Sequence, residues 1–166
     1  MNPNKFRHFF INKYLVKPFA RHKYFVSYNY KYKTIWYHNY KVASRTIKNH
    51  FKENTPENED IYSSETAYIP KMLDDFFKFA FVREPADRLI SSWKNKVVER
   101  NYFNFSQGEL QKYQNLSAFI KWVAAQNIDS CDKHIRSQNS LIDLNELNFL
   151  GRFENFNEDF SSLCQK

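Results

Sequence analysis

The chain has 166 residues, enough for one compact domain. It carries 25 Lys and Arg against 18 Asp and Glu, a formal net charge of +7, and its 42% hydrophobic and 19% aromatic residues exclude disorder along the whole length. Two glycines, Gly108 and Gly151, are too few for a glycine-rich phosphate loop. Two cysteines exclude a disulfide framework, and the sequence shows no signal-peptide or membrane-spanning run, so we expect a cytoplasmic protein.

The charge is distributed unevenly along the chain. Residues 1–50 hold eleven Lys or Arg and no Asp or Glu, whereas the remainder holds fourteen basic and eighteen acidic residues. A segment of this kind faces an anionic partner. Charge alone leaves phosphate esters, sulfate, nucleic acid and acidic lipid as alternatives.

Residues 1–22 form a basic, aromatic arm, and residues 23–166 form the single domain that we expect. Phe6, Phe10 and Tyr14 recur at a spacing of four, which indicates one face of a short helix. An arm packed on its own domain is favoured over a helix in weak contact with a membrane surface, because such faces usually dock within the protein.

The first half of the domain reads as two strands and a helix. Residues 24–29 and 34–39 are rich in aromatic and β-branched residues, and a short polar connection separates them. The period becomes helical after Lys41, with Ile47 and Phe51 four apart. Residues 52–66 are polar and acidic and predict a surface loop.

The second half alternates strands with helices. Residues 79–82 are continuously apolar, which is typical of a strand buried on both faces, and Pro85 suits the first turn of a helix. A helix is expected over residues 116–123, a strand over 147–150 and a closing helix over 156–164. This alternation predicts an α/β domain with a short parallel sheet and helices on both faces.

Two strand-to-helix corners contain residues suited to binding anions. At the first, residues 37–46 pass from a strand into a helix, whose N-terminal N–H groups attract a tetrahedral anion, and Lys41 adds a positive charge. Ser44 as a simple helix cap and Lys41 as a solvated loop residue are the alternative. At the second, Arg83 follows the buried strand and Ser91 lies eight residues later. An ion pair of Arg83 with Glu84 or Asp87 is the alternative there.

These corners resemble a known pair of motifs. Residues 41–44 (Lys-Val-Ala-Ser) are similar to the 5′-phosphosulfate-binding loop of sulfotransferases, and residues 82–85 (Val-Arg-Glu-Pro) with Ser91 are similar to their 3′-phosphate-binding motif. Residues 149–155 with Asp159 resemble the closing signature of the carbohydrate sulfotransferases, and residues 134–138 resemble a segment upstream of it. In the first loop Tyr40 stands where the family usually has proline, and Ala43 where many relatives have glycine.

The resemblance implies a three-layer α/β/α sulfotransferase fold similar to that of P-loop nucleoside triphosphatases. It also implies 3′-phosphoadenosine 5′-phosphosulfate (PAPS) as donor, a hydroxyl acceptor and no metal, and the third motif implies that this hydroxyl belongs to a carbohydrate. Lys41 would be catalytic, and the donor would be held by Lys41, Val42, Ala43, Ser44, Arg45, Thr46, Arg83 and Ser91.

A general base is also needed to take the acceptor proton. Glu65, between the two corners, and His134, beside the third motif, are the candidates, each with a structural role as the alternative. His38 at the end of the first strand is a further candidate, for which a core or rim role is favoured. Cys131 and His134 have the spacing of half a zinc site, but no second pair accompanies them.

Three other function classes compete with the enzyme. A basic domain that stacks nucleic-acid bases on its aromatic residues would use the N-terminal charge. A catalytically inactive nucleotide-binding relative would explain the short middle region. A phosphotransferase is disfavoured because the chain lacks a glycine-rich loop.

Overall fold

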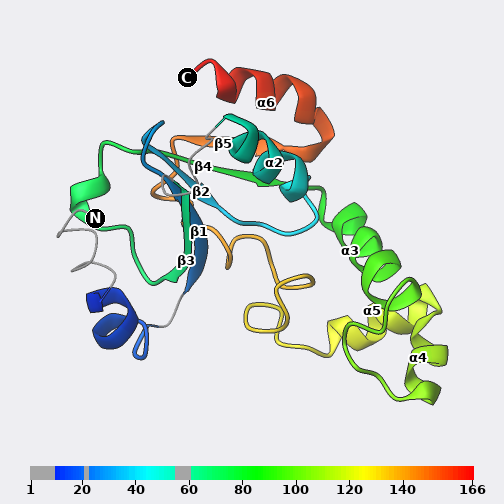
Figure 1. The fold of residues 1–166 in the computed structure, drawn as a ribbon. Coiled ribbons are helices and arrows are strands. Elements are labelled where there is room, and N and C mark those ends of the chain that lie inside the picture. The colour runs from blue at the N-terminus through cyan, green and yellow to red at the C-terminus, as the bar shows by residue number, and fades with distance from the viewer. Residues whose placement is uncertain (1–9, 21–22, 55–60) are drawn as a thin grey trace.

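A computed structural model of the chain describes residues 10–20, 23–54 and 61–166. Its centre is a five-stranded sheet in the order β3-β1-β2-β4-β5 (Figure 1). The strands are β1 (Tyr24–Asn29), β2 (Thr34–Tyr37), β3 (Ile61–Thr66), β4 (Phe77–Val82) and β5 (Phe149–Arg152). The helices are α2 (Ser44–Asn54), α3 (Pro85–Trp93), α4 (Gln107–Tyr113), α5 (Leu116–Ala124) and α6 (Phe156–Cys164), with shorter turns η1 (Asn12–Val16), η3 (Lys71–Leu73), η4 (Lys94–Val98) and η5 (Phe153–Asn155).

The α/β class is confirmed, and the sheet is mixed. β2, β4 and β5 run parallel, as predicted, whereas β1 lies antiparallel to both β2 and β3. A connection as short as residues 30–33 can join only antiparallel strands. The Asn29 side chain forms this turn by accepting hydrogen bonds from the main-chain N–H groups of Lys31 and Tyr32.

Most predicted elements are present, and one prediction is wrong. The segment 61–66, expected within a loop, is the edge strand β3, while residues 55–60 lie outside the described residues. Its polar sequence conceals a strand because one face is open to solvent, and hydrogen bonds to the main chain of β1 decide its conformation. The second strand ends at Tyr37 instead of Asn39, and the last strand is shifted two residues along the chain to Phe149–Arg152.

The two faces of the sheet are covered differently. α2 and α6 lie over one face, where Trp36, Phe79 and Phe81 form a buried cluster that includes Ile47 of α2 (Figure 1). Over the other face, η3 brings Leu73, and the irregular segment between α5 and β5 brings Leu141, onto a cluster that contains other strand residues. Both aromatic and aliphatic side chains therefore fix the carboxyl ends of β2 and β4, from which the two predicted corners start.

Helices α3, α4 and α5 form an extension beyond the sheet (Figure 1). The extension has its own core around Val97, Phe119, Val123 and Ile135. Ile135 comes from the long segment between α5 and β5, so this core holds that segment against α3.

The described part of the N-terminal arm contacts the sheet edge. Asn12 is buried, accepts a hydrogen bond from the Ala67 main-chain N–H, and donates one to the Glu65 carbonyl. Phe10 and Tyr14 pack ring to ring at 4.9 Å between centroids, while Phe6 lies outside the described residues. No helix in the described ranges is both long and apolar enough to cross a membrane.

Candidate donor-binding cleft

The first corner turns sharply between β2 and α2. Lys41 and Ala43 adopt left-handed backbone conformations, with φ of 70° and 60°. Between them the Val42 side chain is fully buried with Trp36 and Ile47. Burial of Val42 anchors the loop, and the two left-handed residues turn the chain around it. Ala43 stands in a conformation that glycine adopts without steric cost.

Asn39 closes this loop from within. Its side chain is buried, and its amide oxygen accepts a hydrogen bond from the Tyr40 N–H. The Ser44 hydroxyl donates to the Asn39 carbonyl at 2.7 Å. The Ser44 side chain therefore ties the start of α2 to the loop that follows β2, instead of capping the helix as the alternative interpretation held.

The second corner begins where β4 ends. The Glu84 carboxylate caps α3 by accepting from the Asp87 N–H, and Pro85 occupies the first helical turn, as predicted. Arg83 makes no ion pair with Glu84 or Asp87. Its guanidinium instead lies 4.2 Å from the centroid of the Phe153 ring and donates to the Lys41 carbonyl at 3.3 Å. The two corners are therefore in direct contact.

The third motif supports the second corner. A Cβ atom on Gly151 would come within 2.3 Å of the Phe81 ring, so only glycine lets β5 approach β4 this closely. Phe153 follows and packs against Arg83. The Glu154 carboxylate accepts from the Glu84 N–H at 2.7 Å, and that bond lowers the Glu154 pKa. The motif thus fixes the main chain on which Arg83 stands.

Gln138 joins both corners. Its side-chain amide pairs with the Arg83 main chain, accepting from the N–H at 2.9 Å and donating to the carbonyl at 2.7 Å. The same Gln138 oxygen accepts from the Asn39 amide. The sequence of residues 134–138 is notable only for its resemblance and predicts no role for Gln138.

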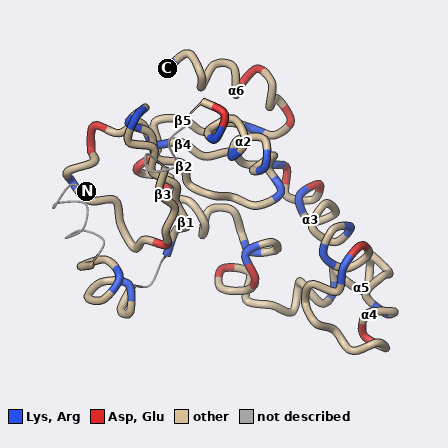
Figure 2. The backbone as a smooth tube through the Cα atoms, in the orientation of Figure 1, with Lys and Arg blue, Asp and Glu red and all other residues tan. Residues whose placement is uncertain are grey.

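The corners enclose a cleft of about 430 Å³. Its lining includes most residues of the two predicted motifs, together with residues from the third motif, α3 and the segment after α5: Tyr40, Lys41, Ala43, Ser44, Arg45, Arg83, Ser91, Asn95, Lys96, His134 and Phe153. Four of these are Lys or Arg and none is Asp or Glu. Figure 2 shows Lys and Arg at the start of α2 and along α3. A cleft with this charge favours a polyanionic ligand.

The cations of the cleft perturb one another. The Lys41 pKa is lowered by burial and then by the positive charge of Lys96. Burial likewise lowers the Lys96 pKa, with further repulsion from Arg100. An anion would relieve this repulsion. Asn95 and Lys96 were missed by sequence analysis, although Asn95 lies one helical turn after Ser91 and this spacing could have indicated it.

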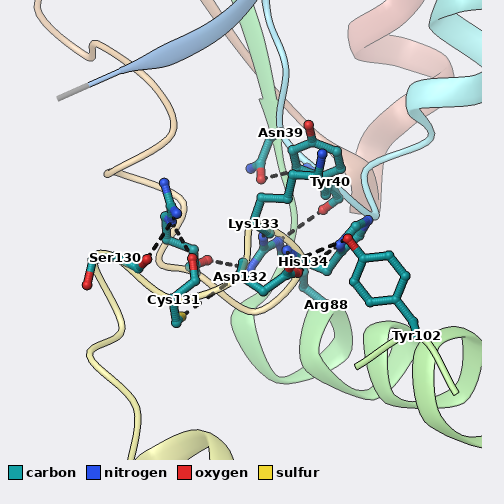
Figure 3. Close-up of polar contacts among 10 residues, drawn as sticks. Asn39, Tyr40, Arg88, Tyr102, Ser130, Cys131, Asp132, Lys133 and His134 are labelled. Atoms are coloured by element: carbon teal, nitrogen blue, oxygen red, sulfur yellow. Dashed lines mark hydrogen bonds and ion pairs between the residues drawn. The ribbon is translucent and has the colours of Figure 1, made fainter. Parts of the chain in front are cut away.

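His134 reaches the cleft as half of a hydrogen-bonded pair (Figure 3). Its Nδ1 lies 2.8 Å from an Asp132 oxygen, and its ring packs between those of Tyr40 and Tyr102. Burial lowers the His134 pKa, so the ring is neutral at pH 7 and its contact with Asp132 is a hydrogen bond. Asp132 thereby favours the tautomer with the proton on Nδ1, which leaves the Nε2 lone pair free to accept.

Other predicted residues do not line the cleft. Glu65 lies on β3 and pairs with Lys17 at 2.5 Å. His38 is hydrogen-bonded through Nε2 to Ser27 at 2.6 Å, and burial lowers its pKa to about 3. The Val42 side chain is in the core, and Thr46 is exposed in the first turn of α2. Val42 and Thr46 could contribute main-chain groups to the loop.

The described ranges contain a second hollow and no candidate metal site. A second hollow, of about 420 Å³ between α2 and α6, has mainly aromatic walls and contains none of the predicted site residues, so the cationic cleft is the better candidate. Among residues whose positions the structure gives, no three His, Cys, Asp or Glu side chains gather in a way that could hold a metal ion.

Comparison with known proteins identifies one family. The model of the Sulfotransferase family matches residues 4–166, nearly the whole chain. No curated protein and no solved structure matches the chain significantly.

Proposed function

The chain belongs to the sulfotransferase family, and from this premise we propose that it moves a sulfuryl group from PAPS to a hydroxyl group of a carbohydrate. Membership makes it a transferase of sulfur-containing groups and implies the donor and a hydroxyl acceptor. The inference that the acceptor is a carbohydrate rests on the resemblance of residues 149–155 to the closing signature of carbohydrate sulfotransferases. The cytoplasmic location stays a prediction.

The observation that carries the proposal is the meeting of Lys41, Arg83 and Ser91 in one cleft. PAPS carries about four negative charges, counting a 3′-phosphate of up to about two. The four Lys and Arg that line the cleft match that charge without a competing carboxylate. The Arg83 Nε is buried without a hydrogen-bond partner among the described residues, so an anion at this corner would satisfy it.

The donor supplies an activated sulfuryl group, and the protein positions it and stabilises the charge that develops on the leaving phosphate. Lys41 neutralises the leaving oxygen, and the main-chain N–H groups at the start of α2, that of Ser44 among them, hold the 5′ end. Arg83 and Ser91 hold the 3′-phosphate. Asn95 and Lys96 add an amide and a positive charge to the same end of the cleft. No step requires a metal.

We assign the general base to His134. Its ring is neutral, Asp132 fixes the Nδ1 proton, and Nε2 can therefore accept the proton of the acceptor hydroxyl. The resulting imidazolium would be stabilised by the Asp132 carboxylate. Glu65 is the best-placed candidate by sequence position, but its pairing with Lys17 gives it another role.

Calorimetric titration with adenosine 3′,5′-bisphosphate, the desulfated donor product, tests the proposal. We expect this nucleotide to bind at least about 10-fold more tightly than ATP or adenosine 5′-monophosphate, because only it offers a phosphate to Arg83 and Ser91. A random oligonucleotide serves as a fourth ligand. Salt-dependent oligonucleotide binding without preference for the bisphosphate would instead support the nucleic-acid-binding alternative.

A further inference from the structure

Arg88 is a buried cation that no sequence motif above assigned. Only 5% of the residue is exposed. Its guanidinium donates three hydrogen bonds, all to main-chain carbonyls: Nε to Tyr40 at 3.0 Å, Nη1 to Arg136 at 2.8 Å and Nη2 to Lys133 at 3.0 Å. Figure 3 shows Arg88 beside Tyr40, Lys133 and His134.

These carbonyls belong to two separate loops. Tyr40 immediately precedes Lys41, whereas Lys133 and Arg136 flank His134. Arg88 itself stands on α3, three residues before Ser91. One side chain therefore connects the elements that carry Lys41, Ser91 and His134, all of which line the same cleft.

The side chain makes these contacts without an ion pair. Among the described residues, no carboxylate lies within ion-pair distance of the Arg88 guanidinium. Burial lowers its pKa to about 10, so it remains charged at neutral pH. Burying a charge that only carbonyl dipoles compensate costs desolvation free energy. That cost argues for a role of Arg88 beyond linking two loops structurally.

We propose that Arg88 is a positioning residue, which holds the Lys41 loop and the His134 loop at the separation from α3 that lets one nucleotide contact both Lys41 and Ser91 and that keeps His134 beside the acceptor. The proposal rests on the donor site proposed above. The planar guanidinium directs donors to three fixed points, whereas the ammonium of lysine is a compact charge on a flexible stem. The position therefore requires the shape of arginine as well as its charge.

Arg88→Lys tests this geometry while keeping the charge. A ligand that spans two corners gains affinity only when both are correctly spaced. We expect affinity for adenosine 3′,5′-bisphosphate to fall at least about 10-fold and affinity for adenosine 5′-monophosphate, which lacks the 3′-phosphate, to fall less than about 3-fold. A role confined to global stability would lower the melting temperature and leave the ratio of the two affinities unchanged.

Arg136→Lys is the matched control. Among the described residues, the Arg136 guanidinium donates to the Cys131 and Ser130 carbonyls, both in its own loop. We expect this variant to retain the affinity ratio of the unsubstituted protein even where its melting temperature falls. An unchanged ratio in Arg88→Lys, or equal losses in the two variants, would overturn the positioning role. If the unsubstituted protein itself shows no preference for the bisphosphate, the proposed donor site fails instead.

Hydrogen exchange of the unsubstituted protein gives a second test that needs no variant. The Ile47 N–H bonds to the Ala43 carbonyl at the first corner, and the Ser137 N–H bonds to the Ile128 carbonyl, away from the cleft lining. Because Arg88 links the two loops, the bisphosphate should slow exchange at both amides over the same concentration range. Slowing at Ile47 with unchanged exchange at Ser137 would contradict the link.

Discussion

The side-chain amide of Asn39 donates to the side-chain oxygen of Gln138 at 2.7 Å, although 99 positions separate the two residues. Asn39 closes the loop that carries Lys41, and Gln138 pairs with both main-chain polar groups of Arg83. This contact sets the 5′ and 3′ ends of the proposed donor site relative to each other. Removing either side-chain amide would leave the buried groups that bond to it without hydrogen-bond partners.

Arg83→Ala should remove selectivity for the 3′-phosphate. A lost charge-assisted hydrogen bond costs about 1.5–3 kcal/mol, which corresponds to a loss of affinity of about 10- to 150-fold. We expect this loss for adenosine 3′,5′-bisphosphate and little change for adenosine 5′-monophosphate, both measured by calorimetry. Arg100→Ala, at an exposed position outside the cleft lining, is the control. Equal weakening of both nucleotides would argue against the assignment of Arg83.

Ala43→Gly should stabilise the protein. Ala43 has a φ of 60°, a conformation in which the Cβ atom costs about 1–2 kcal/mol. Removing the Cβ atom relieves this strain, and the relief exceeds the entropic cost of glycine in the unfolded chain. Urea denaturation should show an increase of roughly 0.5–1 kcal/mol in the free energy of unfolding. Ala86→Gly, at an exposed helical position in α3, should lower it by about 0.5–1 kcal/mol. Similar losses in the two variants would show that Ala43 is unstrained.

The alkaline limb of the pH–rate profile should depend on Lys96. Lys41 acts while protonated, and burial followed by the charge of Lys96 lowers its pKa below 10.5, so activity should decline at a pH below that value. Lys96→Gln removes one positive charge, which raises the Lys41 pKa and should move the limb to higher pH. Lys94→Gln, at an exposed neighbouring position, should leave the limb in place. A shift to lower pH in Lys96→Gln would be incompatible with this electrostatic account.

His134→Gln and Glu65→Gln distinguish the two candidate bases. A base acts on the acceptor and not on the nucleotide, so the correct substitution should reduce transfer roughly 100-fold and preserve bisphosphate binding. We expect that result for His134→Gln. Glu65→Gln should retain transfer, because Glu65 lies on β3 with Lys17 as its partner. The reverse outcome would assign the base to Glu65.

Local sequence signals predicted the parts of the site that depend on one corner each. The apolar run 79–82, followed by Arg83 and Pro85, predicts a strand that leads into a helix, and the structure has β4 and α3 there. β3 escaped prediction because pairing with β1 outweighs its polar composition. The roles of Asn39 and Gln138 could not be predicted, because their contact depends on how distant segments pack together and no local sequence pattern encodes it. Lys96 escaped because a lysine in a helix usually marks a solvated face.

Single-turnover transfer by Lys41→Ala, measured beside its affinity for adenosine 3′,5′-bisphosphate, tests the central claim most directly. Charge develops on the leaving oxygen only as the S–O bond breaks, so Lys41 should stabilise the transition state more than the bound donor. We expect the transfer rate constant to fall by about 100-fold or more and the affinity to fall much less. Lys48→Ala removes an exposed charge from the same helix that follows the loop and should preserve both. An unaltered transfer rate in Lys41→Ala would contradict the mechanism.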